Sequence, residues 1–209
     1  MRKVTEETGS AADDNRVALA RLQLIIGSMA ATVVFNPAMA VLLAVALTVP
    51  GSPFGPIGWP DMAAMVVLQL GLSALTWHLM RRYETVTAGD APRVERWMIL
   101  LQAGLSVGWV LTAWLCWRNG HTVNNVFVTI MMALVVLAAS LARAAHMRIM
   151  LTAVLVQSVS MALLLTLARG HIAHVMLASL PFFVAYVILT AHGARRRVNA
   201  MVPARVRPP

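Results

Sequence analysis

The chain of 209 residues has little cysteine and little charge. Cys116 is its single cysteine, so no disulfide can form within the chain and no zinc site can be built from several cysteines. Only 12% of the residues are charged, whereas 59% are hydrophobic, and the mean hydropathy is +0.74. A soluble domain of this length could not bury so much apolar surface. The composition therefore predicts a protein whose solvent is lipid.

Acidic residues are the scarcest charged type, with eight Asp and Glu against 17 Lys and Arg. None of the eight lies inside a long apolar run, and the nearest, Asp61, stands at the edge of one. Proton-coupled carriers and ion pumps usually need an ionisable group at depth, so this pattern argues against them. The sequence also has no glycine-rich phosphate loop and no nucleophile with a matched base. We therefore expect no enzymatic activity.

Six long apolar runs make up most of the chain. Trp97 to Trp117 contains 21 residues without a charge, with Arg96 before it and Arg118 after it. At about 1.5 Å per residue such a helix is about 30 Å long, which matches the hydrocarbon core of a bilayer. We predict an all-α, polytopic membrane protein with a bundle of six transmembrane helices. The predicted spans are 22–49, 62–80, 97–117, 123–142, 149–168 and 172–191.

The spans define a transmembrane domain over 16–194, with polar segments at both ends. Residues 1–15 are polar and mixed in charge, so we expect a disordered cytoplasmic tail there, and 195–209 form a basic cytoplasmic tail. Pro37 and Pro181 lie inside spans and predict kinks. Residues 38–40 have the form of a signal-peptide cleavage site, but the apolar run continues past them to Val49, which favours a transmembrane span.

The basic residues predict the orientation. Six spans place both termini on one side, and 15 of the 17 Lys and Arg then fall on that side. By the positive-inside rule both termini are cytoplasmic (N-in/C-in), and the net charge of +9 reflects topology rather than nucleic-acid binding. The basic residues on the side of the termini are Arg2, Lys3, Arg16, Arg21, Arg81, Arg82, Arg93, Arg96, Arg143, Arg148, Arg195, Arg196, Arg197, Arg205 and Arg207; Arg118 and Arg169 lie on the other side.

Gly104 and Gly108 form a G-x-x-x-G pair in the third span. This spacing places two positions without side chains on one helix face, so a second helix can approach closely. The partner is either another copy of the chain, which would make a homodimer, or the fourth or fifth span of the same chain. The internal contact is slightly favoured.

Three glutamines lie within spans: Gln69, Gln102 and Gln157. Interhelical hydrogen bonds are the simplest role for such groups. A small transporter or channel is the alternative, with a polar path lined by Gln102, Gln157 and either Asn124 or Asn125. We favour the hydrogen-bonding role.

His121, His171 and His174 are all predicted at the outer ends of spans. His171 and His174 are three residues apart on one helix, so they share a face. Three imidazoles could bind zinc or copper, or become protonated below about pH 6.5 and respond to acidity. The loops are short and no carboxylate is near to orient the rings, which favours ordinary interfacial histidines. No cofactor is predicted on stronger grounds.

Residues 81–202, about three-fifths of the chain, contain a recognisable series of motifs. An Arg-rich loop (RRYETVTAGDAPRVERW) precedes a small-residue span with GLSVGW, and an outer turn with His121 follows. The basic turn LARAAHMR, an outer R-G-H turn and a last span running into ARRRVNAM complete the series. This segment resembles the six-span amino-terminal sensor regions of bacterial histidine kinases and of diguanylate cyclases and phosphodiesterases (GGDEF/EAL proteins).

The resemblance implies a sensory input module of a bacterial signalling protein in the inner membrane, with a cytoplasmic or fused kinase or cyclase as its output partner. In that family the last span continues as a helix into the output domain. Here Pro203, Pro208 and Pro209 follow, which disfavours a continuing helix, and no output domain is present in the sequence. We expect the sixth span, kinked at Pro181, to transmit a shift to Arg195, Arg196 and Arg197.

Overall fold

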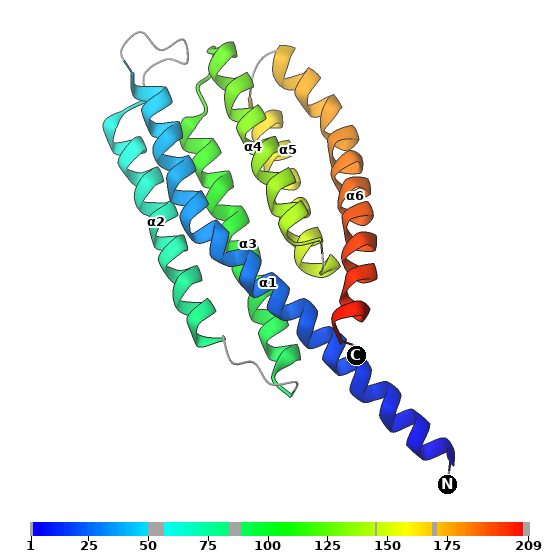
Figure 1. The fold of residues 1–209 in the computed structure, drawn as a ribbon. Helices are drawn as coiled ribbons and strands as arrows, with labels where there is room; N and C mark the ends of the chain where they lie inside the picture. The colour runs from blue at the N-terminus through cyan, green and yellow to red at the C-terminus, as the bar shows by residue number, and fades with distance from the viewer. Residues whose placement is uncertain (1, 50–56, 84–88, 145, 169–170, 207–209) are drawn as a thin grey trace.

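The fold is a bundle of six helices (Figure 1). The computed structural model describes residues 2–49, 57–83, 89–144, 146–168 and 171–206, with the backbone alone for 2–22, 25 and 197–206. No strand occurs within these ranges. The helices are α1 (Arg2–Thr48), α2 (Trp59–Arg82), α3 (Ala91–Cys116), α4 (Thr122–Ala142), α5 (Met147–Leu167) and α6 (His171–Val206).

All six helices are long and apolar enough to cross a membrane, which confirms the predicted number and indicates a multi-pass membrane protein. The spans are Ile26–Thr48, Trp59–Arg82, Ala91–Cys116, Thr122–Ala142, Met147–Leu167 and His171–Arg196.

Two helices begin earlier than hydropathy predicts, and proline explains both. α3 begins at Ala91 rather than Trp97 and has Pro92 in its first turn; α2 begins at Trp59, next to Pro60. Proline suits the first turn of a helix because its φ is already helical and the N–H it lacks would have no partner there.

The two terminal segments differ from the prediction. The structure continues α1 back to Arg2, through the segment expected to be disordered, and α6 forward to Val206, past Pro203. Arg2 to Glu6 and Lys3 to Glu7 are spaced i, i+4, which supports a helix. Prolines do not end either helix, since α1 is continuous through Pro37 and α6 through Pro181. Figure 1 shows α6 curving rather than breaking.

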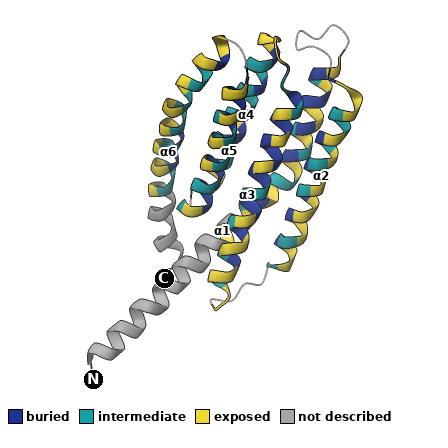
Figure 2. Ribbon diagram, turned by 180° about the vertical axis from the view of Figure 1, so that it is seen from behind, coloured by how far each residue is buried: buried dark blue, intermediate teal, exposed yellow. Residues whose placement is uncertain are grey.

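α3 is the central helix of the bundle. Twelve of its residues are buried, and Figure 2 shows that α3 is largely buried, whereas α6, on the far side of α4 and α5, is largely exposed. α3 contacts α1, α2, α4 and α5, so the run of residues from Trp97 organises the packing of four other helices. α6 packs mainly on α5 and α4, with a smaller contact to α1.

The two glycines of α3 have different surroundings. A Cβ on Gly108 would collide with the side chain of Leu72 on α2, whereas a Cβ on Gly104 would meet nothing within 4 Å. Gly108 therefore allows close packing against α2, not against the fourth or fifth span as expected. The side chain of Leu72 would have to move to make room for a Cβ at this position.

We expect Gly108→Ala to lower the free energy of unfolding by about 1–3 kcal/mol, because the added methyl overpacks the α2–α3 contact. Gly104→Ala is the matched control and should be neutral or stabilising by up to about 1 kcal/mol, since alanine favours helix over glycine. Unfolding in detergent measures both. Equal effects of the two substitutions would contradict the assigned contact.

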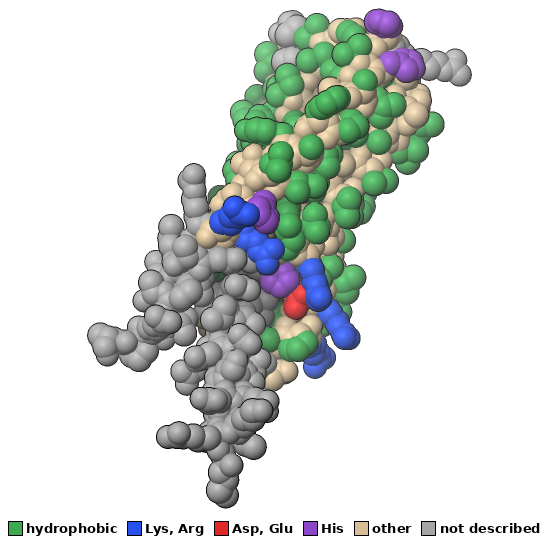
Figure 3. All heavy atoms as spheres, turned by 90° about the vertical axis from the view of Figure 1, so that its right-hand side faces the viewer, with side chains coloured by type: hydrophobic (Ala, Val, Ile, Leu, Met, Phe, Trp, Pro, Cys, Tyr) green, Lys and Arg blue, Asp and Glu red, His purple; other side chains and the backbone are tan. Residues whose placement is uncertain are grey.

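Charged side chains concentrate at one end of the bundle. On the face in Figure 3, hydrophobic side chains cover the upper part and arginines gather at the lower part, the end at which both termini lie in Figure 1. At the opposite end Arg118 Nη2 lies 2.9 Å from Asp61 Oδ2, so one of the two basic residues there is neutralised. Exposed arginines at the end of the termini are Arg81, Arg82, Arg93, Arg96, Arg148 and Arg196.

Candidate ligand-binding site

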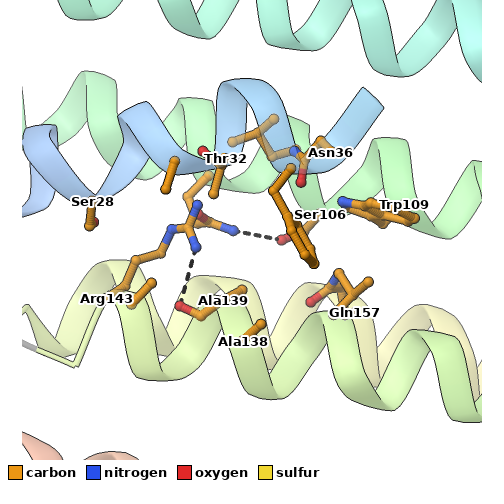
Figure 4. Close-up of a pocket in the computed structure, with 15 residues that line it drawn as sticks. Ser28, Thr32, Asn36, Ser106, Trp109, Ala138, Ala139, Arg143 and Gln157 are labelled. Carbon is orange, nitrogen blue, oxygen red and sulfur yellow. Dashed lines mark hydrogen bonds between the residues drawn. The ribbon is translucent and has the colours of Figure 1, made fainter. Parts of the chain in front are cut away.

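A cavity of about 190 Å³ lies among α1, α3, α4 and α5 (Figure 4). α1 and α3 form one wall, and α4 and α5 form the other. Within the apolar span of α1 (Ile26–Thr48) and within α4, the lining residues lie in the half nearest the chain termini, and those of α3 and α5 lie near the middle of their helices. The cavity therefore extends from the middle of the bundle toward the end of the termini. Its polar lining comprises Ser28, Thr32, Asn36, Gln102, Ser106, Arg143 and Gln157.

Among the residues whose side chains the structure describes, Arg143 is the only charged one that lines this cavity. It caps the carboxyl end of α4, and only 2% of its surface is exposed. Side chains in a helix lean toward the amino end, so Arg143 extends back along α4, where its Nη1 donates a 3.2 Å hydrogen bond to the carbonyl oxygen of Ala139. In Figure 4 its guanidinium lies in the space between α4 and α1.

No carboxylate among the described residues forms an ion pair with Arg143, and its Nε has no hydrogen-bond partner there. Burial lowers the pKa of the guanidinium to about 10, so it remains charged at neutral pH. Buried charges in proteins are normally paired. An uncompensated buried cation next to a cavity is an arrangement that can bind an anion.

Carboxamides from α3 and α5 face the same cavity. Gln102 and Gln157 are 3% and 2% exposed. Gln102 Nε2 donates to Ser106 Oγ at 3.2 Å, but its Oε1 accepts no hydrogen bond from the described residues, and neither does Gln157 Oε1. Buried polar atoms usually have partners. The cavity therefore offers one strong donor group and two unused acceptors.

A second cavity, of about 170 Å³, lies among α4, α5 and α6 in the other half of the bundle. Apolar side chains predominate in its lining, and Phe183 of α6 is among them. Gln157 lines both cavities, and it is near the middle of α5. The two cavities thus follow one another along the bundle and meet at this residue.

The structure brings together only part of the predicted polar path. Gln102 and Gln157 share a cavity, but the neighbouring residues Asn124 and Asn125 do not line it. Asn124 Nδ2 donates to the carbonyl oxygen of Cys116 at 2.8 Å, and Asn125 Oδ1 accepts from the Arg118 N–H at 3.1 Å. Both asparagines therefore stabilise the turn between α3 and α4.

Gln69 has the interhelical role expected of it. Its Nε2 donates to Thr112 Oγ1 on α3 at 3.0 Å, and it lines neither cavity. It is as deeply buried as Gln102 and Gln157, with 0% of its surface exposed. It thus provides a matched comparison for them.

The outer histidines lie where α4 and α6 begin, at the same end of the bundle (Figure 1). His121, His171 and His174 are all exposed. Within the part of the chain that the structure describes, no three His, Cys, Asp or Glu side chains are grouped closely enough to hold a metal ion. Zinc or copper binding remains a prediction without support from the geometry.

Pro181, Arg195 and Arg196 lie along α6, away from the first cavity. The side chain of Arg197 lies outside the described residues.

Sequence reasoning missed Arg143, which it counted only among the residues that set topology. Arg143 and Arg148 belong to the same short turn, yet Arg148 is exposed and pairs with Glu95 at 3.1 Å. The one available signal was position, because Arg143 directly follows a span and its side chain can extend back along that helix.

Comparisons of this chain with protein-family models, curated proteins and solved structures find no match. The functional argument therefore depends on the chemistry of the site.

Proposed function

We propose that this chain is the sensory input module of a bacterial signalling system, and that it responds to a small anion bound at Arg143. The observation that carries the proposal is the buried guanidinium, which borders a cavity and has no carboxylate partner among the described residues. An anion that binds there supplies the missing counter-charge. Its binding would favour whichever arrangement of α1, α3, α4 and α5 encloses it best.

α4 connects this site to α6. Val135 lines the Arg143 cavity, whereas the next residue, Val136, packs in a cluster with Val187 and Ala191 of α6. A movement of α4 on anion binding would therefore shift α6. The carboxyl end of α6 leads to Arg195 and Arg196, where a kinase or cyclase partner would receive the change.

The orientation is part of this proposal. We place the protein in the bacterial inner membrane with both termini in the cytoplasm. The concentration of exposed arginines at the end of the termini supports this orientation. The cavity then lies in the cytoplasmic half of the bundle, and no catalytic step is assigned to the chain.

The test uses the full chain in lipid nanodiscs with a panel of small anions: nitrate, acetate, bicarbonate and inorganic phosphate. At least one should raise the Tm of the wild type by several degrees and not that of Arg143→Gln, because binding to the folded state alone stabilises it. Arg96→Gln, which removes an exposed arginine at the same end, is the control. Equal shifts in all three proteins would contradict the site.

A small transporter is the second candidate, and the observation that favours it is the pair of cavities that meet at Gln157. Uptake into proteoliposomes separates the two functions, since a sensor should accumulate nothing. If the anion that binds is also taken up, Gln157→Leu should abolish uptake while Gln69→Leu leaves most of it. Uptake by the wild type would overturn the sensory proposal.

A further inference from the structure

The charge of the lining limits the ligand of the Arg143 cavity. The described lining contains one guanidinium and no carboxylate, so a single negative charge is compensated and a second one is not. A guanidinium presents paired N–H groups in a plane that match the two oxygens of a carboxylate. Phosphate carries more than one negative charge at neutral pH, so it would place uncompensated charge inside the bundle. These two points favour a monocarboxylate.

The unused acceptors add a second requirement. Gln102 Oε1 and Gln157 Oε1 are buried and accept no hydrogen bond from the described residues, so a ligand with a donor group satisfies one of them. An ammonium group is a poor candidate for that donor, because no lining carboxylate is present to compensate its charge. A hydroxyl group donates without adding charge. The ligand therefore combines a carboxylate with a hydroxyl.

The remaining surface of the cavity is apolar. Phe35, Leu105, Trp109 and Val135 line it, so a short aliphatic or aromatic group of the ligand can be buried there. The volume of about 190 Å³ can enclose a short group of this kind but only part of a long acyl chain. A free small acid is therefore enclosed more completely than a membrane fatty acid with the same headgroup.

We propose that the Arg143 cavity binds a small hydroxycarboxylate with an apolar group. Its carboxylate contacts the guanidinium, its hydroxyl donates to the carboxamide oxygen of Gln102 or Gln157, and its apolar group packs near Trp109. This inference rests on the proposed function, of which it specifies the ligand. In this arrangement Gln102 and Gln157 determine the preference for a carboxylate that carries a hydroxyl group.

The experiment is a calorimetric titration of the full chain in nanodiscs with four probes: mandelate, phenylacetate, inorganic phosphate and palmitate. Mandelate and phenylacetate differ by one hydroxyl group, so their comparison isolates the hydrogen bond to glutamine. We expect mandelate to bind at least tenfold more tightly than phenylacetate. Phosphate and palmitate should bind more weakly than either.

Variants assign the contacts. Arg143→Gln should weaken mandelate binding by at least a hundredfold, and Arg143→Lys by about tenfold because the charge remains but the planar fork is lost. Replacing both Gln102 and Gln157 by leucine should reduce the preference for mandelate over phenylacetate to less than twofold. Arg96→Gln and Gln69→Leu are the controls and should keep the wild-type preference.

Three results with the wild type alone would overturn the inference, so the test holds even if a variant fails to fold. They are equal affinity for mandelate and phenylacetate, tighter binding of phosphate or palmitate, and absence of binding by all four probes. If another anion then stabilises the wild type and not Arg143→Gln, the proposed function survives and the ligand class alone fails. If mandelate binds as expected but is also taken up into vesicles, the ligand class survives and the sensory function fails.

Discussion

Replacing Arg143 by methionine should stabilise the ligand-free protein and abolish anion binding. In the ligand-free bundle the guanidinium is 2% exposed and donates one hydrogen bond, to the carbonyl oxygen of Ala139, while no described carboxylate offsets its desolvation. Replacing buried charges by apolar side chains of similar volume is often stabilising by about 1–4 kcal/mol. We expect a gain in that range for Arg143→Met, reduced somewhat by the loss of the cation at the carboxyl end of α4.

Unfolding in detergent without added anion measures this change, and Arg96→Met is the control. Arg96 is exposed, so its replacement should change the free energy of unfolding by no more than about 0.5 kcal/mol. A loss of stability above about 1 kcal/mol in Arg143→Met would show that the arginine has a structural role. The role in binding a ligand would then lose its main support.

The contribution of Arg143 to the stability of the fold should also depend on pH. Burial lowers the pKa of this group in the folded state to about 10, below its value in the unfolded chain, so at lower pH it is charged in both states and the desolvation cost is constant. Above about pH 10 the unfolded chain binds the proton more tightly. The contribution of Arg143 to stability therefore becomes less unfavourable as the pH rises above this value.

Cysteine labelling should place the two ends of the bundle on opposite sides of the membrane with almost complete contrast. The chain has one cysteine, the buried Cys116, so Cys116→Ala supplies a background without thiols. Asn119→Cys tests the exposed turn between α3 and α4, and Arg82→Cys tests the exposed end of α2. In bacterial spheroplasts a membrane-impermeant maleimide should label Asn119→Cys and leave Arg82→Cys unmodified.

Inverted membrane vesicles supply the control, since labelling should there be reversed. The physical reason is that an arginine-rich end crosses the bilayer far less readily than an end with few basic residues, such as the one that carries Arg118. Labelling of Arg82→Cys from outside would show that the orientation is the opposite of the proposed one. The Arg143 cavity would then lie in the outer half of the bundle and would be assigned to an external stimulus.

The G-x-x-x-G pair shows what a local sequence pattern can predict and what it cannot. The spacing of Gly104 and Gly108 does mark a face of α3 that approaches another helix closely, but the partner is α2, through Leu72, and only Gly108 takes part in it. Spacing determines which residues share a face. It does not specify which of six similar apolar helices packs there, because the apolar side chains that compete for the contact are nearly equivalent.

The sequence by itself determined the helices and their charge asymmetry. These are local properties, since each depends on the hydropathy of about 20 consecutive residues and on the charges that flank them. Only the tertiary structure decided which polar groups meet. Gln102 and Gln157 face one cavity while the equally buried Gln69 bonds Thr112, and Arg143 turns inward while Arg148 pairs with Glu95 at the surface. The physical reason is that the rotation of each helix about its axis follows from packing against its neighbours, and no single segment contains that information.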